Sequence, residues 1–270
     1  LSFLVLLTWM FFFPPEPIPE TYEQVNEQTG QVSNTGNQKL SDQEVQNYNE
    51  NAEQDSSDQF APRVEILTKN LKGSIWLKGG RIDELSLVNY RDTLDKSSNN
   101  VSLLSPLGSD KPYYAFHGWA AMEGLENGDT PNSSTVWILK SGTILTENSP
   151  IVLTWKNDLG VIFEKRISVD ENYMFEVTQS VINGSNSAVK LYPYGNLTRN
   201  GQPDTIGFYI LHEGVVGMQD GELIETNYDD IIELTTEKRT REIQENGWIG
   251  FTDKYWMSTL LPKSGQTFKM

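Results

Sequence analysis

Residues 151–181 read IVLTWK-NDLG-VIFEKRISV-DEN-YMFEVTQSV, and this stretch decides the fold class. It holds three runs rich in apolar and β-branched residues, at 151–156, 161–169 and 173–181. In the third run, the residues that share one face are Tyr173, Phe175, Val177, Gln179 and Val181. Alternation of this kind is typical of a strand with one buried face. Because short turn segments join consecutive runs, the stretch predicts a three-stranded meander.

Similar patterns continue on both sides of this stretch. Gly79 and Gly80 separate two alternating runs and predict a hairpin, since glycine readily takes the positive φ that tight hairpin turns need. No window after residue 61 shows a long 3.6-residue period, and no internal repeat is visible. Further strands are expected at 64–67, 135–139, 189–194, 206–211, 231–235 and 248–251. The sequence therefore predicts an all-β sandwich of many strands over residues 61–270.

The first thirteen residues, LSFLVLLTWMFFF, form an apolar run. A signal-peptide core, a buried helix and the end of a transmembrane helix are three alternatives. The run ends in phenylalanines and prolines rather than at a small-residue cleavage site, and it has almost no polar face. As a helix it would span about 20 Å of a hydrocarbon core of about 30 Å. We interpret residues 1–13 as the C-terminal part of a transmembrane helix that anchors the chain in a lipid bilayer.

The charges that follow give this helix an orientation. No lysine or arginine precedes Lys39, so the positive-inside rule places the following residues outside the cytoplasm. Residues 14–60 carry ten acidic residues against that one lysine, a net charge of 1 − 10 = −9, and four prolines lie between Pro14 and Pro19. Such a segment buries too little apolar surface to fold, and we expect a disordered acidic linker. An acidic docking tail is the alternative.

The composition of the whole chain excludes several function classes. Among 270 residues, 37 are acidic and 21 basic, which gives a net charge of −16. This charge argues against nucleic acid as a partner and against docking on an anionic lipid surface. The chain has no cysteine, which excludes disulfides, thiolate metal sites and a cysteine nucleophile.

Motifs for catalysis or cofactor binding are lacking in the sequence. It has no phosphate-binding loop, dinucleotide fingerprint, zinc-protease motif or nucleophile elbow. Of the two histidines, His117 lies in an aromatic segment, where core packing is favoured over sugar stacking. His212 and Glu213 are the best acid–base candidates, but as strand neighbours they would face opposite ways, and a hydrogen bond at a turn also explains His212. We therefore expect no catalytic residue, no metal site and no cofactor, and we assign no binding residue.

The acidic pairs have simple structural explanations too. On a strand, Asp229 and Asp230 would point to opposite faces and could not share a proton. Glu123 and Glu126 lie in a segment that could hold calcium, but the ligand spacing of an EF-hand is absent, and a solvated acidic loop is favoured. The glycine-rich residues 214–221 are better explained by a turn than by a phosphate loop, because no lysine follows.

Several blocks of sequence together resemble the large periplasmic domain of YidC-type membrane protein insertases. Their order and spacing are similar from about Arg63 to the end, and His117 is a departure from the expected pattern. The blocks are GSIWLKGGRIDELSLVNY at 73–90, VSLLSPLG at 101–108, Tyr113-Tyr114 with Gly118-Trp119, the segment 211–221, Tyr228-Asp229-Asp230, NGWIGFTDKYWM at 246–257 and Leu261-Pro262.

This resemblance implies a β-supersandwich similar to galactose mutarotases, in a protein without enzymatic activity. It implies insertion and folding of inner-membrane proteins, alone or with the Sec translocon, so that nascent membrane proteins and Sec components are the expected partners. It places residues after about 14 in the bacterial periplasm. The family's insertion chemistry lies in a later five-helix membrane core, so residues 61–270 are expected to be a periplasmic domain that is incomplete at its C-terminus. The alternative is a mutarotase-like periplasmic protein that acts on or binds carbohydrate.

Overall fold

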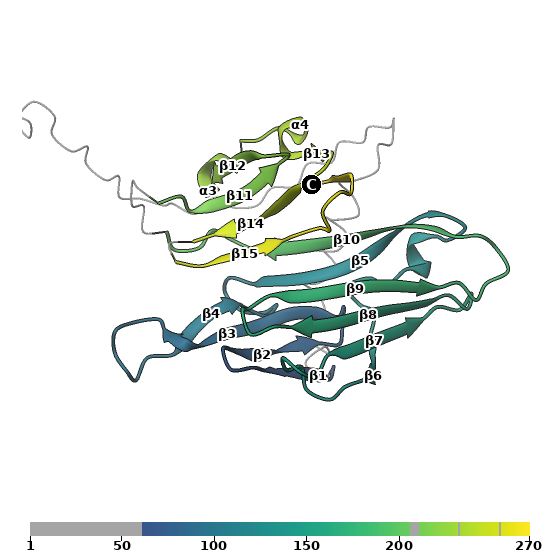
Figure 1. Cartoon of the computed structure of the whole chain (residues 1–270), viewed down its shortest axis with the longest axis horizontal. Coiled ribbons are helices and arrows are strands. Elements are labelled where there is room, and N and C mark those ends of the chain that lie inside the picture. Colours follow the sequence, from purple (N-terminus) through teal and green to yellow (C-terminus); the bar gives the residue numbers. More distant parts are fainter. Residues whose placement is uncertain (1–60, 206–210, 232, 254) are drawn as a thin grey trace, which may run out of the picture. The chain divides into compact units, whose positions relative to one another are not determined.

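The computed structural model describes residues 61–205, 211–231, 233–253 and 255–270, and nearly all their regular structure is β-strand (Figure 1). The predicted all-β fold is confirmed. The strands are β1 (Arg63–Leu67), β2 (Leu71–Trp76), β3 (Arg81–Arg91), β4 (Asn100–Leu104), β5 (Tyr113–Glu123), β6 (Ile138–Ser141), β7 (Ile151–Lys156), β8 (Ile162–Val169), β9 (Phe175–Ile182), β10 (Lys190–Arg199), β11 (Gly214–Gln219), β12 (Glu222–Asn227), β13 (Glu242–Ile243), β14 (Gly247–Thr252), β15 (Met257–Leu260) and β16 (Phe268–Lys269). The helical elements are η2 (Asn127–Asp129), α3 (Tyr228–Ile231) and α4 (Thr236–Arg239).

Two of the sequence predictions fall outside this range. The transmembrane segment at 1–13 and the acidic linker at 14–60 both lie outside the described residues. Within the part of the chain that is described, none of the helices has the length and apolar character needed to cross a bilayer.

Two antiparallel sheets share one apolar core. The larger has the strand order β1-β2-β3-β5-β10, with β4 paired to β3, and the smaller has the order β6-β7-β8-β9. Trp119 of β5 meets Phe163 of β8 edge to face, with ring centroids 5.2 Å apart. Ile75, Ile151 and Leu153 belong to the same buried cluster. Because inward side chains of both sheets fill one interior, the two sheets form a β-sandwich.

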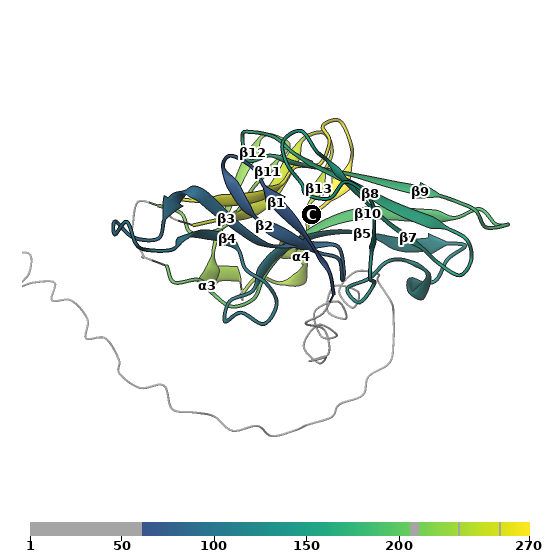
Figure 2. The ribbon, with the colours of Figure 1, turned by 90° about the horizontal axis from the view of Figure 1, so that it is seen from below.

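The stretch that decided the fold forms the predicted meander of β7, β8 and β9. Neighbouring strands pair antiparallel along their length, and β8 and β9 run side by side in both views (Figure 1 and Figure 2). Alternate residues of β9 are half-buried, and those between them are exposed. The half-buried residues are Phe175, Val177, Gln179 and Val181. Tyr173 differs from the prediction: it precedes the strand, is exposed and has a φ of 71°.

A third sheet has the strand order β12-β11-β14-β15, and β13 pairs with β16. Strand β15 lies beside β10 of the sandwich. Phe251 of β14 packs edge to face on Tyr113 of β5 at 5.9 Å, so the third sheet contacts the core of the sandwich. The turn predicted in the glycine-rich segment joins β11 to β12 through Asp220 and Gly221, both with positive φ.

The predicted glycine hairpin is also present. Gly79 and Gly80 lie between β2 and β3, with φ values of 76° and 63°. Two consecutive residues with positive φ strongly favour glycine, because a side chain is strained in this conformation. The hairpin aligns Trp76 with Arg81 and fixes the register of the first two long strands.

Some strand predictions are wrong or shifted. Strand β6 begins at Ile138, three residues later than the predicted run. The run at 231–235 is not a strand: Ile231 ends α3, and Glu233 begins a turn that leads to α4. Acidic residues in the first turn of α3 favour a helix N-terminus there. Most of the strand expected at 206–211 lies outside the described residues.

Candidate functional site

A buried lysine interrupts the apolar interior of the sandwich. Because β8 alternates, Phe163, Lys165 and Ile167 all point inward, and Lys165 is only 2% exposed. Its Nζ donates a hydrogen bond to the carbonyl oxygen of Gly79 at 3.4 Å and lies 4.4 Å from the centroid of the Trp137 ring. No carboxylate among the residues that the structure describes pairs with this amine. Burial lowers the pKa of Lys165 to about 7.

His117 lies on the core-facing side of β5, between Ala115 and Trp119, and is half-buried. Burial, together with the charge of Lys165, lowers the pKa of His117 to about 4. This position supports core packing over an exposed sugar-stacking role. With these pKa values, the amine of Lys165 is partly neutral and the ring of His117 is neutral at pH 7, and such protonation states are also found in acid–base catalysis. Because Lys165 is only 2% exposed, a substrate would not reach its amine, and we expect both residues to affect the stability of the fold instead.

A polar cluster joins the sandwich to the third sheet. Arg199 of β10 donates from Nη1 to both carboxylate oxygens of Asp253 at 2.9 Å and to the hydroxyl of Tyr228 at 2.8 Å. The guanidinium also lies 4.7 Å from the centroid of the Tyr113 ring. Desolvation raises the pKa of Tyr228, so its hydroxyl stays protonated and donates to Asp253. Because the charges of Arg199 and Asp253 are paired with each other, we interpret the cluster as a structural contact and not as a binding site.

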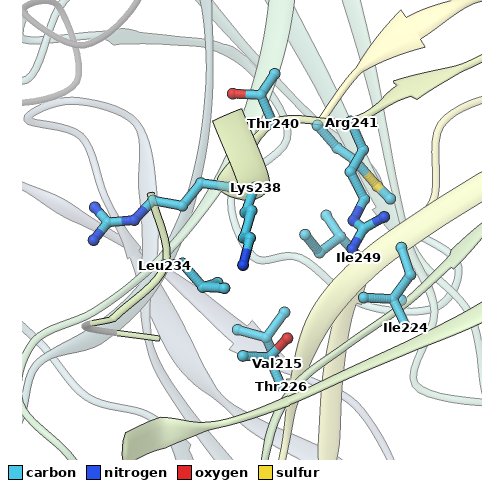
Figure 3. A pocket seen from close by; sticks show the side chains of 11 residues that line it. Val215, Ile224, Thr226, Leu234, Lys238, Thr240, Arg241 and Ile249 are labelled. Carbon is cyan, nitrogen blue, oxygen red and sulfur yellow. The ribbon is translucent and has the colours of Figure 1, made fainter. Parts of the chain in front are cut away.

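An open cavity of about 390 Å³ lies between the third sheet and the segment 234–241 (Figure 3). The aliphatic side chains of Val215, Ile224 and Ile249 form its floor, on strands β11, β12 and β14. These residues share one face because Gly217 pairs with Ile224 on one side and with Ile249 on the other. Gly217 has no side chain, which leaves the centre of the floor open.

Three cationic residues, Lys238, Arg239 and Arg241, line this cavity above the apolar floor. Figure 3 shows Lys238 and Arg241 extending toward Val215 and Ile249, respectively. Arg241 donates from Nη1 to Gln219 Oε1 at 3.1 Å. No carboxylate pairs with Lys238 or Arg241 within the described ranges, and no described acidic residue lines the cavity. In a chain of net charge −16, this cavity is a local positive site on an apolar surface.

The acid–base candidates from the sequence lie elsewhere. His212 and Glu213 precede β11, so the expectation that they are strand neighbours is wrong. The Nε2 of His212 is 2.8 Å from the carbonyl oxygen of Val215 and donates a hydrogen bond to it. This contact supports the alternative in which His212 has a structural role at a turn.

The paired aspartates also differ from their predicted setting. Asp229 and Asp230 lie in α3 and not on a strand, so the argument from opposite strand faces does not apply. Asp229 accepts a hydrogen bond from Gln202 at 3.1 Å, and Asp230 accepts one from Asn227 at 3.2 Å. These contacts order the start of α3.

The segment considered for calcium is held by protein contacts. Glu123 ends β5 and pairs with Lys190 at 3.5 Å, while Glu126 and Asp129 form a capping box around η2. In the described ranges, no group of three or more histidine or acidic residues is arranged to hold a metal ion.

The residues that stand out in the structure were not among the candidates predicted from the sequence. Lys165 was detectable, because it lies two residues from Phe163 and two from Ile167 on the apolar face of its run. Lys238 and Arg241 belong to the basic cluster KRTR at 238–241, which contrasts with the acidic chain. Their place over an apolar floor depends on strands that are not adjacent in the sequence.

Comparisons with known proteins agree with this architecture. The family model described as the YidC periplasmic domain matches residues 63–270. The protein named membrane protein insertase YidC from Dinoroseobacter shibae is 44% identical over 99% of this chain and 46% of its own length. The protein of that name from Roseobacter denitrificans is 46% identical over 97% of this chain and 45% of its own length. The chain thus spans somewhat less than half the length of these relatives. On this similarity, the chain belongs to the YidC family, and its residues 63–270 form a YidC periplasmic domain.

Proposed function

We propose that this chain provides the periplasmic part of a membrane protein insertase that assists the insertion and folding of inner-membrane proteins. The observation that carries the proposal is the match to YidC relatives along almost the whole chain, at 44% and 46% identity. The all-β fold and the family match over 63–270 support it as well. In this proposal the chain has no catalytic residues and contributes surfaces.

The partners and the location follow from the same resemblance. The substrates are nascent membrane proteins, which the insertase receives alone or with Sec translocon components. Residues 1–13 are the membrane-embedded end of a helix in the bacterial inner membrane, and residues after about 14 lie in the periplasm. The absence of lysine and arginine before Lys39 supports this orientation. Nucleic acid is not a partner, consistent with the net charge of −16.

The proposal can be tested in cells depleted of their own insertase. The full-length protein that contains this chain is expressed there, and insertion of a model inner-membrane protein is measured by its protection from protease. We expect insertion to be restored. Failure to restore it at a normal expression level would refute the proposed function.

A second measurement tests whether a client protein contacts this domain. A photoreactive amino acid at exposed Tyr192 of β10 is expected to form adducts with a nascent membrane protein held on the ribosome. The same probe at exposed Leu94, in the loop between β3 and β4, shows whether the yield of adducts depends on where the probe is placed. If neither site gives adducts while insertion is restored, the client contact of this domain is refuted.

The carbohydrate alternative gains no support from the described residues. His212 contacts the backbone of its own segment, and Lys165 is buried. We expect the chain to leave the rate of sugar anomer exchange unchanged. An acceleration that disappears in His212→Ala would show that the domain is catalytic.

A further inference from the structure

We propose that the cavity between the third sheet and residues 234–241 binds a single-chain amphiphile with an anionic head group, of the fatty-acid type. The site is distinct from the insertase activity and does not depend on it. Three observations carry the inference: an aliphatic floor, three cationic residues in the lining (Lys238, Arg239 and Arg241), and no acidic residue among the described lining residues.

The floor fits an apolar chain. Val215, Ile224 and Ile249 present branched aliphatic side chains on one face of the sheet, and Leu234 lies opposite them across the cavity (Figure 3). Gly217 leaves the centre open because it has no side chain, and a Cβ there would lie only 2.8 Å from the carbonyl oxygen of Trp248, so a larger residue would require a shift. Small-ligand sites of a few hundred cubic ångströms are lined mainly by apolar side chains with a few placed polar groups. The cavity of about 390 Å³ falls in this size range and combines an apolar floor with a polar and cationic rim.

The cationic groups fit an anionic head group. Lys238 and Arg241 line the same cavity and have no carboxylate partner in the described residues, so they repel each other when the site is empty. A carboxylate or phosphate between them would replace this repulsion with charge-assisted hydrogen bonds. Arg241 already donates one hydrogen bond to Gln219, which holds its side chain over the floor.

The charge of the protein favours a single molecule over a membrane surface. A protein of net charge −16 is repelled by an anionic bilayer, in which many head groups lie close together. One amphiphile brings only one or two negative charges, and these meet the local cations of the cavity. The competing occupant is an acidic segment of this same chain, which would use the same cations.

The test uses the whole chain in nanodiscs of zwitterionic lipid. The probe is dodecanoic acid with a photoactivatable diazirine in its chain, and labelled peptides are identified by mass spectrometry. We expect labelling of β11, β12 and β14. The double variant Lys238→Gln/Arg241→Gln should label about tenfold less, as loss of a charge-assisted contact implies. The double variant Lys72→Gln/Lys156→Gln, which removes two exposed lysines from the sandwich, is the matched control and should label like the parent.

Two further comparisons separate the roles of the chain and the head group. The alcohol analogue of the probe has the same chain with a neutral head group and should label about tenfold less than the acid. Thr226→Phe adds bulk at the wall without changing the charge and should also block labelling. Acetate and inorganic phosphate should not compete, because they lack an apolar chain.

Several results would overturn the proposal. Equal labelling by the acid and the alcohol would show that the cations do not select the ligand. Competition by acetate or phosphate would show a simple anion site. Displacement by a synthetic peptide of residues 41–60 at a lower concentration than dodecanoate would assign the cavity to the chain's own acidic segment. Because insertion of a client is measured separately, none of these results depends on the proposed insertase function.

Discussion

Replacing Lys165 with methionine should stabilise the protein and remove much of the rise of its stability with pH. Methionine fills a similar volume without a charge, so the apolar packing around β8 is kept. In the folded protein the pKa of Lys165 is about 7, against 10.5 for an ordinary lysine. Between these two values the unfolded chain holds one more proton than the folded protein. The free energy of unfolding therefore rises with pH across this window.

The magnitude follows from the shift in pKa. Each pH unit between about 7 and 10.5 contributes about 1.4 kcal/mol, so the whole window corresponds to about 5 kcal/mol. Below pH 7 both states are protonated and the full cost of the buried charge remains. Above pH 10.5 both are neutral and the cost vanishes. Lys165→Met should thus exceed the parent in stability most clearly at and below pH 7, and the gain should shrink steadily toward pH 10.

The assay is urea unfolding of the whole chain in mild detergent at pH 6, 7, 8, 9 and 10, followed by tryptophan fluorescence. The signal comes from seven tryptophans, among them Trp137, whose ring centroid lies 4.4 Å from the amine of Lys165. Lys156→Met, on an exposed position of neighbouring β7, is the matched control, and its difference from the parent should not change with pH. A constant stability difference between Lys165→Met and the parent from pH 7 to 10 would refute the reasoning, because it would mean that the amine is not desolvated.

Three other substitutions probe separate parts of the fold. The folded protein resists protonation of the His117 ring until about pH 4, so the parent should lose about 3 kcal/mol of unfolding free energy between pH 6.5 and 4. His117→Gln should abolish this loss. An unchanged midpoint of acid unfolding would contradict the prediction. Gly73→Ala places a Cβ 2.0 Å from the carbonyl oxygen of Glu84 and should destabilise by about 3 kcal/mol in thermal unfolding, whereas a neutral effect would show that β2 and β3 can separate. Arg199→Lys loses the paired hydrogen bonds to Asp253 and should cost about 2 kcal/mol, with most of that cost absent in an Asp253→Asn background.

The sequence predicted the strands wherever alternation and turn residues agreed. The meander at 151–181 and the Gly79-Gly80 hairpin combine both signals, and both are present in the structure. The run at 231–235 has β-branched residues without the alternation of a half-buried strand, and its flanking aspartates suit a helix start better. Propensity alone therefore misassigned this segment. The local context of charges would have corrected the prediction.

The candidate cavity was beyond prediction for a different reason. Its floor comes from β11, β12 and β14, and Lys238 and Arg241 come from the segment between β12 and β14. Strand order and register decide that these residues meet, and neither can be read from one segment. The basic cluster is visible in the sequence, but its apolar floor exists only after the sheet has formed.

Lys165 shows the opposite case, in which the signal is present within a single strand segment. The run VIFEKRISV places Phe163, Lys165, Ile167 and Val169 on one face, and three of these four residues are apolar. In a sheet with one solvated face, a lysine would be expected on the polar side. An alternation that is correct except for one lysine therefore indicates a buried charge, because shifting the strand by one residue would expose the other three. The strand keeps its register because the burial of three apolar side chains outweighs the cost of one desolvated amine. The lowered pKa of Lys165 reports that cost and can be measured.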